Sequence, residues 1–144
     1  MKIGLLSDTH NNLSNLLAAL DTFRERGIKT IIHCGDLTRL EMLTHLEGFR
    51  IIYTTGNMDV MTGTIRKRLE KMRADNFAGT IFKGKLGGVP VAATHSHIEG
   101  TVMKLLQEGR YKWLFHGHTH VKRDEVIKGV RIVNPGALGG VGRE

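Results

Sequence analysis

Six groups of Asp, Asn and His residues stand out because each directly follows a short apolar run. In chain order the groups are Asp8 with His10, Asp36, Asn57 with Asp59, His95 with His97, His116 with His118 and His120, and Asn134. Carboxylates, a carboxamide and imidazoles supply the mixed oxygen and nitrogen ligands of a divalent transition metal, whereas calcium prefers oxygen alone. The single cysteine excludes a zinc finger. The residue types therefore predict metal-dependent chemistry.

Taken one at a time, these residues have ordinary structural explanations. An Asp after a strand is usually a turn former or a helix cap, and Gly56-Asn57 alone indicates a turn. A single His-x-His pair is as often chance as metal ligation. What favours a site is six such groups in order, each at the end of an expected strand. In open α/β sheets ligands gather beyond the carboxyl ends of strands, so the groups can converge.

The elements that must position these groups are read from apolar periodicity. Short runs rich in β-branched residues predict buried strands, and apolar residues at helical spacing predict helices between them. Strand followed by helix followed by strand indicates an α/β fold. Expected strands are residues 3–6, 30–33, 50–53, 89–94, 112–115 and 130–133, and expected helices are 12–26, 40–46, 64–72 and 100–107.

The sequence also predicts details of two helices and of the strand connections. The first helix carries one apolar stripe, formed by Leu13, Leu16, Leu17, Leu20 and Phe23, and the helix at 40–46 follows Thr38 as a candidate N-cap. Glycines between residues 77 and 89 predict a strand, a turn and another strand. Lys128-Gly129 is expected at a hairpin tip, so part of the chain should pair antiparallel.

Length and composition limit the class of protein. The chain has 144 residues, which predicts one domain spanning 1–144, and the lone Cys34 predicts a reducing, cytoplasmic compartment and a packing role for its side chain. No apolar run is long enough to cross a bilayer, so no membrane partner is expected.

Net charge is +7, and the segment from 61 to 85 carries seven basic and two acidic residues. Its ordinary interpretation is a solvated helix face. The alternative is binding of a polyanion such as nucleic acid, which charge alone supports, through Arg66, Lys67, Arg68, Lys71 and Arg73.

Five ordered motifs resemble the signature of the calcineurin-like metallophosphoesterases. They are Asp8-x-His10, Gly35-Asp36, Gly56-Asn57, His95-x-His97 and Gly117-His118-x-His120. More narrowly, the Gly-Asn-x-Asp form at 56–59 and Asn134-Pro135-Gly136 resemble the small microbial phosphodiesterase branch. The resemblance implies two packed mixed β-sheets flanked by helices, with a two-metal site at one edge.

By this resemblance the chain is a hydrolase of small phosphate esters, most simply a phosphodiesterase. The first metal would be held by Asp8, His10, Asp36 and His120, and the second by Asp36, Asn57, His95 and His118, with Asp36 as the bridge. Two divalent ions, Mn²⁺ or alternatively Ni²⁺, Zn²⁺, Fe²⁺ or Co²⁺, would share a hydroxide that attacks phosphorus. The expected catalytic residues are Asp36, Asn57 and His97, with His97 directed at the phosphate.

Other polar residues receive lesser roles. Asp59 is expected to orient a ligand or cap a loop, His116 is expected outside the ligand set, and His33 and His45 are expected to be structural.

The chain also departs from the family pattern. Met58 stands where many larger relatives carry a histidine thought to protonate the leaving group, so substrates with good leaving groups are expected. Relatives usually continue for another strand or two, whereas this sequence stops at Glu144. An exposed sheet edge is therefore expected, available to a partner or to homo-oligomer formation. The alternative to an enzyme is a non-catalytic interaction scaffold, because the same fold serves in the retromer coat.

Overall fold

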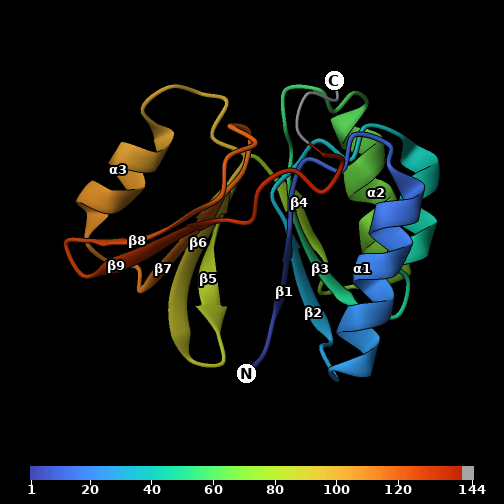
Figure 1. Cartoon of the computed structure of the whole chain (residues 1–144), viewed down its shortest axis with the longest axis horizontal. Helices are drawn as coiled ribbons and strands as arrows, with labels where there is room; N and C mark the ends of the chain where they lie inside the picture. The colour runs from blue at the N-terminus through green and yellow to red at the C-terminus, as the bar shows by residue number, and fades with distance from the viewer. Residues whose placement is uncertain (141–144) are drawn as a thin grey trace.

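Four parallel strands form the first sheet, and each is a short run of apolar residues. The computed structural model describes residues 1–140, and within them this sheet has the order β1-β2-β3-β4. All four strands run toward the same end of the molecule, which is the upper end in Figure 1. The bounds are β1 (Gly4–Leu6), β2 (Thr30–His33), β3 (Arg50–Thr54) and β4 (Phe77–Gly79).

The second sheet is mixed, with the order β5-β6-β7-β9-β8 in the described part of the chain. Strands β6, β7 and β9 are parallel to one another, while β5 and β8 pair antiparallel at the two edges. The tip of the β8–β9 hairpin is Lys128-Gly129, as the sequence predicts. The bounds are β5 (Ile81–Leu86), β6 (Val89–Thr94), β7 (Trp113–His116), β8 (Arg123–Ile127) and β9 (Val130–Asn134).

Helices cover the outer faces of both sheets. In Figure 1, α1 (Leu13–Glu25) and α2 (Thr62–Met72) lie against the first sheet and α3 (Thr101–Glu108) lies on the far side of the second. The 3₁₀ helix η1 (Leu40–Leu46) joins α1 and α2 in one apolar core. Two packed sheets flanked by helices are the predicted fold class, which is confirmed. The predicted single domain 1–144 includes residues 141–144, which lie outside the described residues.

Between the sheets lies a second core. Ile32 and Ile52 from the first sheet pack with Val91 and Phe115 from the second, and the buried Cys34 belongs to the same cluster. The packing role predicted for this cysteine is therefore confirmed. The loops that follow the strands of both sheets therefore extend from one shared apolar layer.

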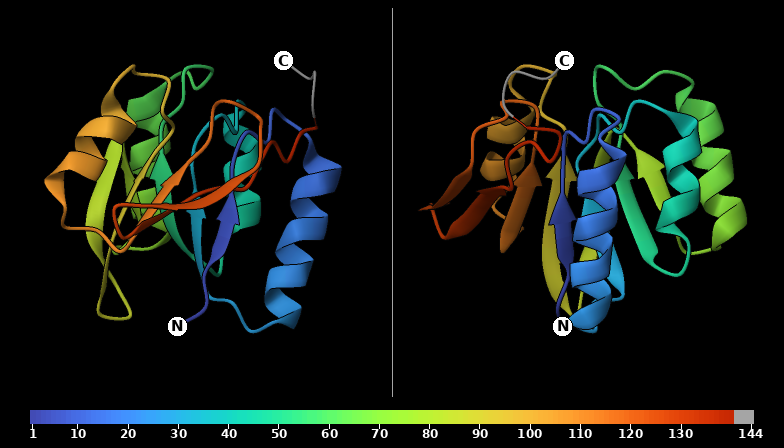
Figure 2. Two further views of the ribbon diagram at one scale, coloured as in Figure 1. Left: turned by 60° about the vertical axis from the view of Figure 1, so that its left-hand side comes forward. Right: turned by 45° about the vertical axis from the view of Figure 1, so that its right-hand side comes forward.

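Two details of the helices differ from the sequence prediction. Thr38 does not cap η1, which is a 3₁₀ helix preceded by Arg39 without a side-chain cap; Thr38 instead donates its backbone N–H to Asp59. In α1 only part of the predicted stripe is buried, since Leu13 and Leu17 are 40% and 39% exposed. Figure 2 shows α1 alongside the edge strand β1, so one side of its stripe extends past the sheet.

The strand β8 was not among the predicted strands. Its residues are mostly exposed, and its sequence is charged, so it lacks the apolar run that marks the others. Within residues 1–140, no helix has the length and apolarity needed to span a membrane.

Candidate metal centre

The predicted ligands lie on loops that leave the upper ends of the strands in Figure 1. Loops after β1, β2 and β3 carry Asp8, His10, Asp36 and Asn57, and loops after β6 and β7 carry His95, His118 and His120. The first sheet therefore contributes both carboxylates and the second contributes three of the four imidazoles.

The first cluster consists of Asp8, His10 and His120, whose ligand atoms lie within 4.8 Å of one another. The Nε2 atom of His120 is 3.2 Å from Asp8 Oδ1, and the Nε2 atom of His10 is 3.5 Å from the same oxygen. The two Nε2 atoms are themselves 3.1 Å apart. Three lone-pair donors thus point at one small volume.

The second cluster is built around Asp36 and His95, which also lie within 4.8 Å of Asp8. The Nε2 atom of His95 is 3.1 Å from Asp36 Oδ2, and the Oδ1 atom of Asn57 is 3.0 Å from His95 Nε2 and 3.1 Å from His118 Nδ1. His10 Nε2 is 3.9 Å from Asp36 Oδ2, so Asp36 faces both clusters.

The floor of the site is buried and its mouth is open. Asp8, Asp36 and His95 are almost fully buried, whereas Asn57 and His118 are exposed. Asp8 Oδ1 is fully buried and has no hydrogen-bond partner among the described residues. A buried carboxylate oxygen without a donor is costly, and a cation would remove that cost. The donor set therefore fits a divalent metal ion.

Hydrogen bonds fix the orientation of the ligands. His95 Nδ1 donates to the carbonyl oxygen of Cys34 at 2.6 Å, which leaves its Nε2 atom facing Asp36. Asp8 Oδ2 accepts from the Ser7 hydroxyl at 2.6 Å and from the backbone N–H of His118 at 3.0 Å. Such outer contacts orient metal ligands and raise their basicity.

Electrostatics favour a charged Asp36. Burial alone would raise the pKa of Asp36, but the hydrogen bond and charge of His95, together with the N–H of Met58, hold that pKa below its usual value. Burial would lower the pKa of His95, and the carboxylates of Asp36 and Asp8 raise it instead. The site therefore attracts positive charge.

The backbone is strained at the same place. Left-handed φ angles occur at five of the seven predicted ligands: Asp8, His10, Asp36, His118 and His120. Each such residue costs on the order of 1 kcal/mol or more, and clusters of them are typical of functional sites.

Two glycines make room for the carboxylates. A Cβ atom at Gly56 would collide with the Asp36 side chain, and one at Gly117 would collide with the side chains of Ser7 and Asp8. Glycine is needed at these positions because the loops approach the ligands so closely.

His97, His116 and Asn134 also follow strands, and each lies in a different relation to the ligand clusters. His97 is half-buried, and its ring centroid lies 5.5 Å from that of His95 and 6.3 Å from that of His118, beside the second cluster. His116 points away from the ligand set: its Nδ1 lies 3.1 Å from the carbonyl oxygen of Gly117, and its Nε2 lies 3.4 Å from Arg123. Asn134 supports the His118 loop through Gly117 and Thr119.

Sequence reasoning gave no role to Ser7 or Tyr53. Ser7 orients Asp8, and the buried Tyr53 donates to Asp59 at 2.7 Å. Their positions in the sequence could have indicated these roles, because Ser7 lies next to a predicted ligand and Tyr53 ends a predicted strand. Neither residue type indicates such a contact by itself.

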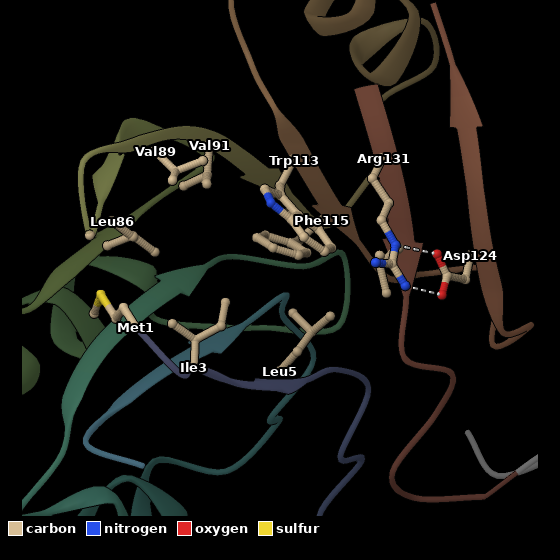
Figure 3. A pocket seen from close by; sticks show the side chains of 12 residues that line it. Met1, Ile3, Leu5, Leu86, Val89, Val91, Trp113, Phe115, Asp124 and Arg131 are labelled. Carbon is tan, nitrogen blue, oxygen red and sulfur yellow. Dashed lines mark hydrogen bonds and ion pairs between the residues drawn. The ribbon is translucent and has the colours of Figure 1, made fainter. Parts of the chain in front are cut away.

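An apolar groove lies away from the predicted ligands. A groove of about 370 Å³ opens between the sheets beside β1, and none of the seven predicted ligands lines it. Figure 3 shows Ile3 and Leu5 on one wall, Trp113 and Phe115 on the other, and the Arg131–Asp124 ion pair at the rim. Its lining is mostly apolar and carries no metal-ligating cluster, so the chemistry is assigned to the strand-end loops.

The basic residues proposed for polyanion binding are exposed on or just after α2. Arg66 pairs with Glu70 at 3.0 Å and Arg73 with Asp75 at 2.6 Å. Paired side chains on a solvent-facing helix agree with the ordinary interpretation of this segment.

An α/β fold with carboxylates and imidazoles converging at its strand ends defines the class of proteins that can bind divalent metal ions there. The sequence matches the calcineurin-like phosphoesterase superfamily domain over residues 1–144. The chain belongs to this superfamily of metal-dependent phosphoesterases and is a hydrolase.

Individual relatives agree with this assignment. The chain is 30% identical over 138 residues to a protein named phosphodiesterase MJ0936 from Methanocaldococcus jannaschii, covering 94% of this chain and 83% of that one. A solved archaeal phosphodiesterase superposes with a TM-score of 0.93 at 30% identity, covering 99% of this chain and 87% of the other. Vps29 from Chaetomium thermophilum, with a TM-score of 0.69 and 14% identity over 96% and 73% of the two chains, shows the shared fold alone.

Proposed function

We propose that this chain is a dinuclear phosphodiesterase that uses Mn²⁺ and acts on small phosphodiesters in the cytoplasm. The observation that carries the proposal is the convergence of donors on the buried, partnerless Asp8 Oδ1 and on Asp36. The 30% identity to a named phosphodiesterase supports the class of substrate. The single, buried Cys34 supports a reducing compartment.

Each ligand has a role in this proposal. Asp8, His10 and His120 would hold one ion, Asn57, His95 and His118 would hold the other, and Asp36 would be available to both. A pair of bound divalent cations lowers the pKa of water and neutralises charge on the phosphoryl oxygens. The protein's own part is to keep the ligand lone pairs aimed inward, through the contacts of His95 with Cys34 and of Asp8 with Ser7.

His97 is the proposed contact to the phosphate. Its ring lies beside His95 and His118, and its buried Nδ1 atom has no hydrogen-bond partner among the described residues. An imidazole in that position can donate to a phosphoryl oxygen as charge develops there. His97→Ala is therefore expected to lower kcat while leaving the Kd for the metal close to that of the wild type.

The leaving group should need little protonation. Met58 is 47% exposed beside Asn57 and offers no proton. An aryl phosphodiester, whose leaving group is a weak base, should therefore be cleaved faster than an alkyl phosphodiester. No observation in the described residues favours the interaction scaffold, because the predicted ligands are all present and clustered.

The test is hydrolysis of bis(p-nitrophenyl) phosphate with Mn²⁺, Ni²⁺ or Zn²⁺ added in turn. Activity should appear with a metal and disappear with chelator, and Asp36→Asn and His118→Ala should each lose about 100-fold or more. His45→Ala removes a histidine on η1 and should keep wild-type turnover, with folding checked by thermal unfolding. Equal turnover by wild type, Asp36→Asn and His118→Ala would refute the site.

A further inference from the structure

Next to the loops that carry the predicted ligands lies a row of three polar side chains, His33, Tyr53 and Asp59. His33 and Tyr53 are fully buried, at 0% exposure each, inside the sheet layer. Polar groups in that position destabilise a fold unless they are hydrogen-bonded, so their partners indicate what they do.

His33 joins the first two ligand loops. Its Nδ1 atom accepts the backbone N–H of Gly35 at 3.1 Å, so Nε2 carries the proton and donates to Thr9 Oγ1 at 2.8 Å. Thr9 lies between the ligands Asp8 and His10, and Gly35 directly precedes Asp36. Backbone hydrogen bonds from Asp8 to Gly35 and from His10 to Asp36, both 2.9 Å, also join these loops, and the imidazole adds a buried side-chain link between them.

Tyr53 continues the row into the next strand. It is the register partner of His33 in the parallel pair of β2 and β3, and the two rings stack with centroids 5.1 Å apart and planes 19° apart. Its hydroxyl accepts the backbone N–H of Leu37 at 3.0 Å and donates to Asp59 Oδ2 at 2.7 Å. Burial and the charge of Asp59 raise the pKa of Tyr53, so the hydroxyl remains a donor.

Asp59 ties the second ligand loop to the third. Its carboxylate accepts the backbone N–H groups of Asp36 at 2.9 Å, Gly56 at 2.8 Å and Thr38 at 3.3 Å. Asp36 and Thr38 both have left-handed φ angles, +62° and +77°, which non-glycine residues adopt only when their surroundings hold them there. Asp59 supplies that restraint.

We propose that His33, Tyr53 and Asp59 form a positioning layer that sets the spacing of the two metal sites. The hydrogen bonds of the layer go to Thr9 and to backbone N–H groups of the loops, not to the side chains of the predicted ligands. The layer would therefore act by holding the loops that carry Asp8, Asp36 and Asn57. This inference rests on the proposed dinuclear site. It extends the orienting role expected of Asp59 to His33, which was expected to be structural, and to Tyr53, which was given no role.

The test compares two tyrosine variants. Tyr53→Phe removes only the hydroxyl and keeps the ring that stacks on His33. Tyr111→Phe is the matched control, because Tyr111 is the only other tyrosine, is also buried, and also donates to a carboxylate, Glu108, at 2.6 Å. Binding of Mn²⁺ is measured by calorimetry without substrate, alongside thermal unfolding of the metal-free proteins.

Tyr53→Phe is expected to bind Mn²⁺ about 10- to 100-fold more weakly than wild type, and saturating Mn²⁺ should restore most of kcat. Tyr111→Phe should bind Mn²⁺ like wild type at a similar loss of unfolding temperature. Asp59→Asn, which replaces one accepting oxygen with a donor, should also weaken Mn²⁺ binding.

The layer is refuted if Tyr53→Phe and Asp59→Asn bind Mn²⁺ with wild-type affinity, or if Tyr111→Phe loses as much affinity as Tyr53→Phe. Wild-type protein that binds none of Mn²⁺, Ni²⁺ and Zn²⁺ would instead overturn the dinuclear site and, with it, the layer. The two failures are therefore distinguishable.

Discussion

At the scale of single residues, the site depends on how closely the loops approach the carboxylates. Asp8 is held by the Ser7 hydroxyl and by the N–H of His118, and Gly117 leaves the space that this arrangement needs. A side chain at position 117 would push Asp8 away from His10 and His120. The glycine is therefore as necessary as a ligand, although it has no side chain to offer.

Gly117→Ala should abolish tight Mn²⁺ binding and lower the unfolding temperature, because the new methyl group would collide with the side chains of Ser7 and Asp8. Gly63→Ala is the matched control: a Cβ atom there meets nothing within 4 Å, and alanine favours the helix α2 by about 0.5–1 kcal/mol. Calorimetric titration of both variants checks the expectation, and wild-type affinity in Gly117→Ala would contradict it.

His33 makes stability depend on pH. Burial lowers the pKa of His33 from 6.5 to about 4, against the opposing charges of Asp59, Asp8 and Asp36 and with a small contribution from His95. Between these values the unfolded chain binds a proton that the folded chain excludes, so stability falls as the pH drops from about 6.5 toward 4 and is flat above. The loss is on the order of 3 kcal/mol.

Urea unfolding in the presence of chelator at pH 7 and pH 4.5 measures this effect. The wild type should lose more free energy of unfolding between the two pH values than His33→Gln, in which the titrating imidazole is absent. His45→Gln should keep the wild-type pH dependence. An identical pH dependence in wild type and His33→Gln would show that His33 does not cause it.

At the scale of elements, the helix α1 illustrates how packing selects from a sequence pattern. Its apolar stripe is wider than the face it buries, because α1 lies over β1, where Phe23 packs against Gly4 at the edge of the sheet. Leu16 and Leu20 face the core, while Leu13 and Leu17 extend toward solvent.

Leu16→Ala and Leu17→Ala should therefore differ strongly although the residues are neighbours. Leu16 is 0% exposed, and its truncation should cost about 2–5 kcal/mol of unfolding free energy. Leu17 is 39% exposed, and its truncation should cost about 1 kcal/mol or less. Equal losses in chemical denaturation would mean that α1 is packed in a different rotation.

At the scale of the whole molecule, the candidate metal centre draws its residues from both sheets. Asp8, His10, Asp36 and Asn57 come from the first sheet, and His95, His118 and His120 come from the second. Ions bound between these loops would link the sheets at one end, where like-charged carboxylates otherwise repel. In the described part of the chain β1, β4, β5 and β8 are the edge strands of the two sheets, and use of an exposed edge in a homo-oligomer stays a prediction.

Metal should therefore stabilise the fold. Mn²⁺ at about 100 times its Kd should add about 3 kcal/mol and raise the unfolding temperature by several degrees, and chelator should reverse the rise. Asp8→Asn, which removes the charge that faces His10 and His120, should respond much less. Thermal unfolding with and without metal checks this, and an unchanged wild-type unfolding temperature would count against the site.

The sequence by itself determined the buried apolar strands, the order of the ligand motifs and the family, whereas the charged, exposed strand β8 was missed. It could do so because buried parallel strands are continuous apolar runs, and because the polar residues that follow them must lie at one end of the sheets. The strands at 30–33 and 89–94 match their predicted bounds for this reason.

Only the tertiary structure decided which groups support the ligands. The links from Thr9 through His33 and Tyr53 to Asp59 join residues from four places in the chain, and nothing in a residue type fixes the direction of its hydrogen bond. The same holds for η1, where a turn expected to be α-helical is a 3₁₀ helix and Thr38 serves Asp59 rather than a helix end. The local pattern of apolar residues predicts which segments are buried. Hydrogen-bond partners depend instead on how distant segments pack together, and that packing cannot be read from the sequence of either segment.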